Sequence, residues 1–140
     1  MKPKILVADD DDEFAQLLVF NLLSNGCDAF RASNGIEALH LARSRAPDAI
    51  LLDVLMPDLD GLSVCEILRS QPSTWNTPVF MLSALSRSYA DKRNSKARFN
   101  GYFQKPVRLS ALMQAVRVAC EEHRETQEQA GSDRVAGRTT

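Results

Sequence analysis

The stretch at residues 48–61, DAILLDVLMPDLDG, decides the fold of this chain. Residues 49–52 form an apolar run of strand length without polar alternation, which is typical of a strand buried on both faces. Pro57 and Gly61 indicate a loop after that run. A strand covered on both faces belongs in a parallel sheet with helices on either side, so the stretch predicts an α/β protein.

The same alternation of strand and helix patterns extends to both ends of the chain. The apolar run 5–8 meets four aspartates at 9–12, which suit the first turn of a helix, and Gly26 suits its end. Right-handed crossovers then place helices on both faces of the sheet. We predict strands at 5–8, 27–32, 49–52, 78–82 and 102–104, and helices at 14–22, 36–42, 62–68, 87–98 and 109–119.

Composition is that of one globular domain. The chain has 140 residues, of which 44% are hydrophobic and 25% charged, and its formal net charge of −1 gives no support for nucleic-acid or membrane binding driven by bulk charge. The three cysteines form no CxxC pair, which favours free thiols in a reducing compartment. We therefore expect a cytoplasmic protein.

The end of the chain differs in composition from the rest. After Cys120 the sequence is almost entirely polar: its first part is compatible with an extension of the last helix, and the rest offers too little apolar surface to order itself. We predict a domain at residues 1–122 and a polar, disordered C-terminal tail or linker at 123–140.

Polar side chains stand where four of the predicted strands end. Asp9 and Asp10 follow the first strand and Asp53 the third. Ser83 follows the fourth strand and Lys105 the fifth. Because the functional crevice of such a sheet lies at the carboxyl ends of its strands, we expect these side chains to converge.

The convergence has a chemical meaning. Three carboxylates brought together repel one another at pH 7 unless protons or a cation join them, and a set of oxygen ligands suits Mg²⁺. Lys105 adds a positive charge and Ser83 a hydroxyl donor. A carboxylate nucleophile, a divalent metal, a lysine and a hydroxyl together indicate a phosphoryl-transfer site.

Each of these residue types also has a commoner role. Acidic runs usually cap helices, and we assign that role to Asp11 and Asp12. A lone aspartate after a strand is more often a turn residue, a lone serine a cap and a lone lysine a surface residue. The joint placement at four strand ends is what favours the phosphoryl-transfer interpretation.

Four segments of the chain resemble the receiver domains of bacterial two-component systems, including the chemotaxis-type single-domain regulators. The resemblance covers about residues 3–122 and implies a flavodoxin-like, doubly wound α/β fold. That fold has five parallel strands in the order 2-1-3-4-5 and five helices. The segments, in the family's order and spacing, are ILVADD at 5–10, the stretch 48–61, PVFMLSA at 78–84 and YFQKP at 102–106.

The resemblance implies a role for each acidic residue of the expected site. Asp53 resembles the phosphoacceptor of the family. Asp9 and Asp10 resemble its acidic metal pair, so that they would hold Mg²⁺ together with Asp53 and the backbone carbonyl of Leu55. No further cofactor is expected.

The resemblance also implies how phosphorylation is sensed. Ser83 and Lys105 resemble the pair that binds the phosphoryl oxygens, and Ser83 and Tyr102 resemble the switch residues. The peptide bond from Lys105 to Pro106 is expected to be cis, as in the family. Arg98 departs from the glycine that the family usually has there, and the predicted helix 87–98 is unusually polar.

The implied function is that of a phosphorylation-dependent signalling switch. A histidine kinase or phosphotransfer protein supplies the phosphoryl group, and an output protein or domain reads the resulting conformational change. The protein is not expected to be an enzyme beyond its own phosphoryl transfer and slow autodephosphorylation. Neither direct nucleic-acid binding nor a membrane partner is expected.

Three other interpretations fit the sequence less well. A phosphatase of the haloacid-dehalogenase type needs a second aspartate two positions after the nucleophile, where this chain has Leu55. In a flavodoxin-like cofactor binder the aspartates at 9–12 would repel the cofactor's phosphate. A degenerate receiver that only binds proteins is not supported, because all the key positions are filled.

Overall fold

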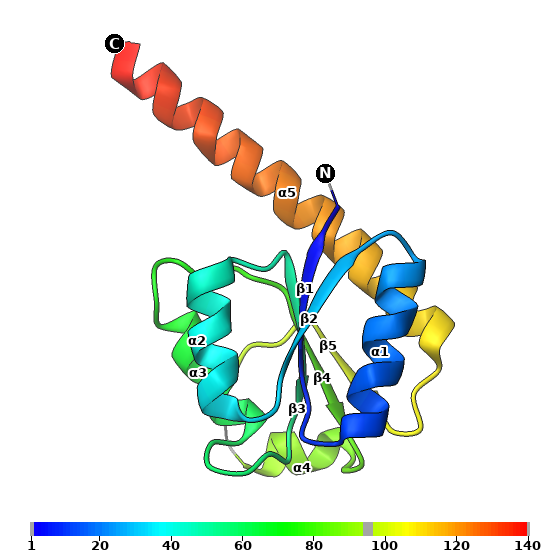
Figure 1. Ribbon diagram of the computed structural model, residues 1–140. Helices are drawn as coiled ribbons and strands as arrows, with labels where there is room; N and C mark the ends of the chain where they lie inside the picture. Colours follow the sequence, from blue (N-terminus) through cyan, green and yellow to red (C-terminus); the bar gives the residue numbers. More distant parts are fainter. Residues whose placement is uncertain (1, 94–96, 140) are drawn as a thin grey trace.

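The computed structural model describes residues 2–93 and 97–139, with side chains through Glu128. Its centre is one sheet of five parallel strands in the order β2-β1-β3-β4-β5 (Figure 1). The predicted α/β class and strand order are therefore confirmed. The strands are β1 Lys4–Ala8, β2 Asp28–Ala32, β3 Ala49–Asp53, β4 Val79–Ser83 and β5 Gly101–Gln104.

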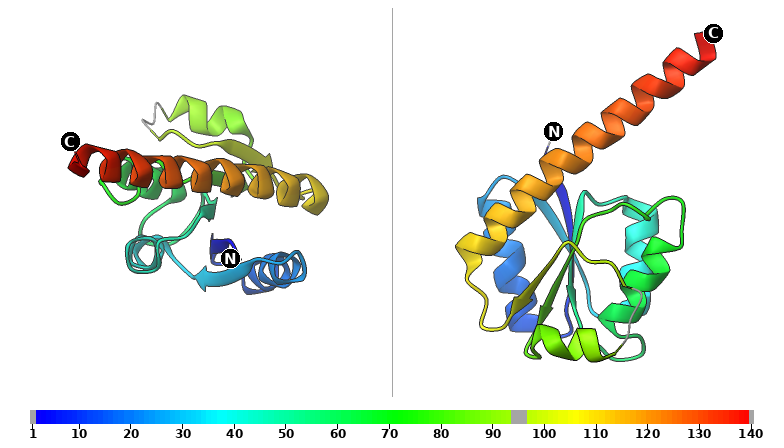
Figure 2. Two further views of the ribbon diagram at one scale, coloured as in Figure 1. Left: turned by 90° about the horizontal axis from the view of Figure 1, so that it is seen from above. Right: turned by 180° about the vertical axis from the view of Figure 1, so that it is seen from behind.

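Helices cover both faces of this sheet. The helices α1 and α5 lie on one face and α2 and α3 on the other, while α4 lies at the lower end of the sheet in Figure 1 and in the rear view of Figure 2. The helices are α1 Asp12–Ser24, α2 Gly35–Arg45, α3 Gly61–Arg69, α4 Arg87–Lys92 and α5 Leu109–Thr139.

Neighbouring residues of one strand belong to different cores. In β1, Leu6 packs into the core beneath α2 and α3, and Val7 packs into the core beneath α1 and α5. All five residues of β3 are buried. Because side chains alternate between the faces of a strand, a sheet covered on both faces requires the continuous apolar run that the sequence shows.

Local signals begin and end the elements near the functional edge. Asp11 is the N-cap of α1, with its carboxylate accepting a hydrogen bond from the Phe14 backbone N–H, as predicted for this acidic run. Gly26 follows the end of α1 with a φ of +82°, which favours glycine. Gly61 begins α3 so close to the backbone of Asp53 that any side chain would overlap it.

One arginine ties two loops together at the opposite edge. Arg69, in the last turn of α3, donates from Nε to the Arg98 carbonyl at 2.8 Å. Its Nη1 donates to the carbonyls of Trp75 and Thr77, and its Nη2 to Asn100 Oδ1. The loop before β4 is thereby joined to the loop before β5.

The fourth helix is shorter than predicted. It covers only Arg87–Lys92, and residues 97–98, which the sequence assigned to its end, are not helical. Residues 94–96 of the predicted helix lie outside the described residues. Ala90 is the one fully buried residue of α4, so this polar segment has little apolar contact to extend its helix.

The last helix is longer than predicted. It continues to Thr139, beyond the predicted range 109–119 and beyond the first part of the polar segment, the only part for which the sequence left a helical extension open. The propagation of a helix costs no new nucleation, and the glutamates, glutamines and arginines after Cys120 are good helix formers. In both views its C-terminal part projects beyond the sheet without another element beside it (Figures 1 and 2).

Two further observations concern the predicted organisation of the chain. The domain boundary near residue 122 falls inside α5 and stays a prediction. Among the described residues, no helix is both long and apolar enough to cross a membrane.

Candidate functional site

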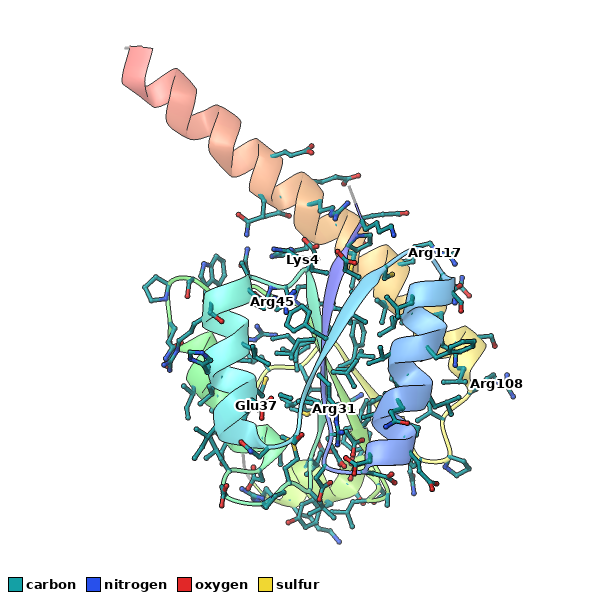
Figure 3. All side chains as sticks on the ribbon, in the orientation of Figure 1. Lys4, Arg31, Glu37, Arg45, Arg108 and Arg117 are labelled. Carbon is teal, nitrogen blue, oxygen red and sulfur yellow. The ribbon has the colours of Figure 1, made fainter. Side chains whose placement is uncertain are left out.

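Four strands deliver polar groups to one edge of the sheet. Asp9 follows β1, Asp53 is the last residue of β3, Ser83 is the last residue of β4, and Lys105 follows β5. This edge is the lower one in Figure 3, where α1 begins and α4 lies. The sequence-predicted residues therefore share the carboxyl edge of the sheet.

An acidic cluster lies at the centre of this edge. Asp9, Asp10 and Asp53 each offer a carboxylate oxygen, and these oxygens all lie within 4.8 Å of one another. Asp9 and Asp53 are buried, whereas Asp10 is exposed. An all-oxygen group with one solvent-facing carboxylate fits a divalent cation such as Mg²⁺, which keeps several waters.

Lys105 supplies the positive charge of the cluster. Its ammonium donates to Asp9 Oδ2 at 2.9 Å and to Asp53 Oδ2 at 3.2 Å, and it lies 4.4 Å from the centre of the Phe14 ring. Burial works against the charged form of Lys105. The bonds and charges of the two aspartates outweigh burial, so the pKa of Lys105 is raised.

Asp53 lies in surroundings that disfavour its negative charge. Burial, followed by the charge of Asp9, raises the pKa of Asp53 to about 6, although Lys105 and the Leu55 backbone N–H stabilise the carboxylate. The N–H of Leu55 donates to Asp53 Oδ1 at 3.2 Å. The cluster therefore carries more negative charge than Lys105 alone can neutralise.

The raised pKa predicts how stability depends on pH. Since the pKa of Asp53 in the folded protein lies above the ordinary aspartate value of 3.8, the free energy of unfolding of the metal-free protein falls as pH rises from about 4 to about 6. The substitution Asp53→Asn removes the titrating carboxyl group and with it this pH-dependent loss of stability. We expect the variant to be more stable than the parent by about 2 kcal/mol at pH 7 and to lose this advantage near pH 4. Denaturant unfolding in EDTA at both pH values measures the difference, and an equal difference at both would contradict the prediction.

Ser83 and Tyr102 meet at the loop that follows β4. Ser83 is fully buried, and its Oγ accepts a hydrogen bond from the Leu85 N–H at 3.1 Å. The Tyr102 hydroxyl donates to the Leu85 carbonyl at 2.7 Å. Burial, with a smaller contribution from the charge of Asp53, raises the pKa of Tyr102. Both predicted switch residues therefore contact Leu85.

The structure also answers two smaller expectations. The peptide bond between Lys105 and Pro106 is cis, as the resemblance implies. Arg98, which stands where the family usually has glycine, is not among the residues with a positive φ. A side chain at this position therefore needs no strained backbone.

Sequence reasoning missed two residues that contact the site. Phe14 is the first residue of the predicted helix 14–22, where an apolar side chain by itself indicates only packing, yet its ring lies beside the Lys105 ammonium. Arg31 had no signal in the sequence, because β2 carries no other polar residue at this edge. Its guanidinium donates two hydrogen bonds to the Asp9 carbonyl.

The structure is a flavodoxin-like α/β module with an acidic site at the carboxyl edge of its sheet. A family model for the response regulator receiver domain matches residues 5–117. The chain belongs to this family, and it is a receiver domain of the kind that serves as a phosphorylation-dependent signalling switch. Membership decides in favour of the receiver over the phosphatase and the flavodoxin-like cofactor binder.

Curated relatives agree with this assignment. The chain is 36% identical over 126 residues to the alkaline phosphatase synthesis transcriptional regulatory protein PhoP of Bacillus subtilis, covering 85% of this chain and 52% of PhoP. It is 35% identical over 115 residues to the DNA-binding dual master transcriptional regulator RpaA of Synechocystis, covering 82% of this chain and 48% of RpaA. The chain spans about half the length of the curated relatives it matches.

Solved receiver domains have the same fold. The receiver domain of the Francisella response regulator 1452 superposes with a TM-score of 0.78 at 38% identity, covering 86% of this chain and 98% of that one. The receiver domain of the sensor histidine kinase PA1611 from Pseudomonas aeruginosa has a TM-score of 0.76 at 25% identity, covering 86% and 99%. The PA1611 structure has a magnesium ion coordinated in its active-site cleft.

Proposed function

We propose that Asp53 accepts a phosphoryl group from a phosphohistidine on a partner protein. A carboxylate oxygen forms the new bond to phosphorus while the bond from phosphorus to the imidazole nitrogen breaks, and the imidazole leaves with a proton. The observation that carries this proposal is the position of Asp53. It ends the central strand β3, beside two further carboxylates and 3.2 Å from the Lys105 ammonium.

The same proposal includes a magnesium site. Asp9, Asp10 and Asp53 are its carboxylate ligands, and the Leu55 carbonyl completes the set that the family resemblance implies. The excess negative charge of the cluster and the ion in the PA1611 receiver support this assignment. When bound, Mg²⁺ neutralises charge on the phosphoryl oxygens.

Lys105 and Ser83 are suited to hold the phosphoryl oxygens. The Lys105 ammonium already touches an oxygen of Asp53 and has a third N–H to offer a new anion. Ser83 Oγ accepts a hydrogen bond from the Leu85 N–H, and its own O–H can turn from the neighbouring Tyr102 hydroxyl to donate to a phosphoryl oxygen. Ser83 ends β4, which is the neighbour of β3, and Lys105 follows β5, which is the next strand along.

Leu85 provides a route from the phosphoryl group to the surface. Its N–H is bound by Ser83 and its carbonyl by Tyr102. A Ser83 hydroxyl drawn toward the phosphoryl group therefore shifts the backbone that holds the Tyr102 hydroxyl. The phosphorylated protein then favours a different arrangement around α4 and β5, which is a population shift between two states.

The partners follow from this role. We propose a histidine kinase or histidine phosphotransfer protein as the donor and a downstream protein or domain as the output. Leu17, Phe20 and Leu23 form an exposed apolar stripe along α1, the helix that begins at the site, and this stripe supports docking of a protein donor. The absence of direct nucleic-acid binding and a cytoplasmic location stay predictions, the latter supported by three free cysteines.

Phosphorylation by a small donor tests the proposal. After incubation with acetyl phosphate and Mg²⁺, intact mass spectrometry should show the gain of one phosphoryl group, and EDTA should prevent it. The protein performs this transfer and the slow hydrolysis of its own acyl phosphate, and we propose no other catalysis. No gain of mass with Mg²⁺ present would contradict the proposal.

The acyl phosphate should be long-lived for a receiver domain. Hydrolysis needs a water in line behind phosphorus, and Leu55 and Leu85 flank that approach in the family's arrangement. Leu55 is exposed and Leu85 half-buried, and neither side chain can orient a water. The variant Leu55→Asn, Leu85→Glu should lose its phosphoryl group about tenfold faster, a change of about 1–2 kcal/mol. The decay of the phosphorylated mass in Mg²⁺ gives the rate.

A matched control separates this effect from a general loss of surface leucines. Leu23 lies on α1 and is about as exposed as Leu55, at 52% against 48%. The substitution Leu23→Asn should leave the decay rate unchanged. If the double variant decays no faster than the parent, the two leucines do not set the lifetime.

A further inference from the structure

Arg31 lies on the edge strand of the sheet, next to the start of the acidic loop. It pairs with Val7 of β1 in the register of the sheet, one residue before the end of β2. It shares a face of β2 with Ala29, which packs beneath α1 and α5. Figure 3 places Arg31 at the lower edge of the sheet, where α1 begins. The side chain therefore starts beneath the loop that joins β1 to α1.

The guanidinium of Arg31 holds this loop at two points. Its Nε and Nη2 donate to the Asp9 carbonyl at 3.3 and 3.0 Å. Its Nη1 lies 2.6 Å from Asp12 Oδ1. One rigid side chain thus connects the residue before the loop with the first residue of α1.

The bond to the Asp9 carbonyl bears directly on Asp10. This carbonyl belongs to the peptide that joins the two residues, so its orientation sets where the Asp10 side chain begins. The carboxylate of Asp9 has its own anchors, namely Lys105 and the Asp11 N–H. Among the described residues, the Asp10 carboxylate has no hydrogen-bond partner. Its position depends on the backbone that Arg31 holds.

The shape of the arginine matters as well as its charge. The planar guanidinium presents several N–H groups in fixed directions, whereas a lysine ammonium acts as a single point charge. The Arg31 fork binds the Asp9 carbonyl through Nε and Nη2 and the Asp12 carboxylate through Nη1, an arrangement that a lysine, with one nitrogen in place of three, does not reproduce. Since Arg31 and Asp12 carry opposite charges, the pair adds no net charge to the site.

We propose that Arg31 is a positioning residue for the metal site, which acts by fixing the Asp9–Asp10 peptide and so the carboxylate of Asp10. This inference rests on the proposed magnesium site. Outer groups that orient a metal ligand typically change metal affinity 10- to 100-fold when they are removed. We expect an effect near the lower limit, because Asp9 and Asp53 keep their other contacts.

Magnesium titration of a charge-balanced variant tests the inference. The double substitution Arg31→Met, Asp12→Asn removes one positive and one negative charge, so the formal net charge of −1 is unchanged. Isothermal titration calorimetry should give a Mg²⁺ dissociation constant about tenfold higher than that of the parent. Arg31→Lys should be weakened by a similar factor, and Asp12→Asn alone by less than about threefold, because it leaves the carbonyl contacts intact.

A control variant and two further measurements test whether the loss of Mg²⁺ affinity is specific to Arg31. Arg45→Met removes an exposed arginine at the opposite end of the sheet (Figure 3) and should leave Mg²⁺ affinity unchanged. Unfolding in EDTA should show that the double variant is folded. Its labelling by acetyl phosphate should be slow at low Mg²⁺ and approach the parental rate at saturating Mg²⁺, because Asp53 itself is unaltered.

The outcomes distinguish the two proposals. Parental Mg²⁺ affinity in the double variant, parental affinity in Arg31→Lys, or a labelling defect that persists at saturating Mg²⁺ would each overturn the positioning role and leave the magnesium site standing. Absence of Mg²⁺ binding by the parent would overturn the magnesium site, and the inference with it.

Discussion

The Asp53→Asn protein is expected to gain no phosphoryl group from acetyl phosphate and Mg²⁺. An amide oxygen is a poor nucleophile toward phosphorus. Neither of the other two carboxylates of the cluster lies at the end of the central strand β3, where Asp53 lies. Intact mass after incubation reports the result directly. This is the largest effect that we expect from any single substitution, because it removes the acceptor itself.

Asp58→Asn provides the matched control for this result. Asp58 is exposed in the loop after β3 and has a φ of +69°, a conformation that asparagine tolerates well. The Asp58 variant should be labelled like the parent. Full labelling of Asp53→Asn would end the assignment of Asp53 as the acceptor.

The second large effect is expected from Asp10→Ala. Asp10 is the exposed member of the acidic cluster, and its carboxylate is free to bind an ion. Removing a unit charge at contact distance should cost roughly 2–3 kcal/mol of Mg²⁺ binding, which raises the dissociation constant by about 30- to 150-fold. Labelling at low Mg²⁺ should be largely lost. Magnesium titration by calorimetry and labelling by intact mass measure the two consequences.

The control for Asp10→Ala is the loss of a neighbouring charge that is not a ligand. Asp12→Asn removes one negative charge two residues away, where the carboxylate faces Arg31 and solvent. Its Mg²⁺ affinity should change less than about threefold, because exposed charges are well screened. Equal losses in both variants would indicate that Asp10 contributes only general charge.

The strand ends explain why so much of the site was predictable. A strand buried on both faces admits polar residues only where it leaves the sheet, so Asp53 and Ser83 mark the ends of β3 and β4 in the sequence itself. The parallel order then brings these ends to one edge. The acidic group of Asp9, Asp10 and Asp53 follows from that geometry. Its assignment as the phosphorylation site stays a prediction.

Other features depend on contacts that no pattern encodes. Arg31 reaches the site from a neighbouring strand, and nothing in the alternation of β2 indicates where a long side chain ends. The length of α4 depends on how few apolar contacts its polar segment makes, and the extension of α5 past residue 123 depends on local helix formation rather than burial. The contacts of Arg31 and the lengths of α4 and α5 therefore depend on weak local preferences together with tertiary contacts, which a sequence pattern does not show.

The bonds of Arg69 have a consequence for how this sequence can vary. Four of its partners, at Thr74, Trp75, Thr77 and Arg98, are backbone carbonyls, which every amino acid provides. These bonds hold the two loops together whatever side chains stand at the four positions, whereas the bond from Arg69 to Asn100 Oδ1 depends on the asparagine side chain. Substitutions at these positions are therefore expected to alter the outer surface beside β5 without loosening the sheet, and Arg98 itself takes part in the contact with Arg69 through its carbonyl.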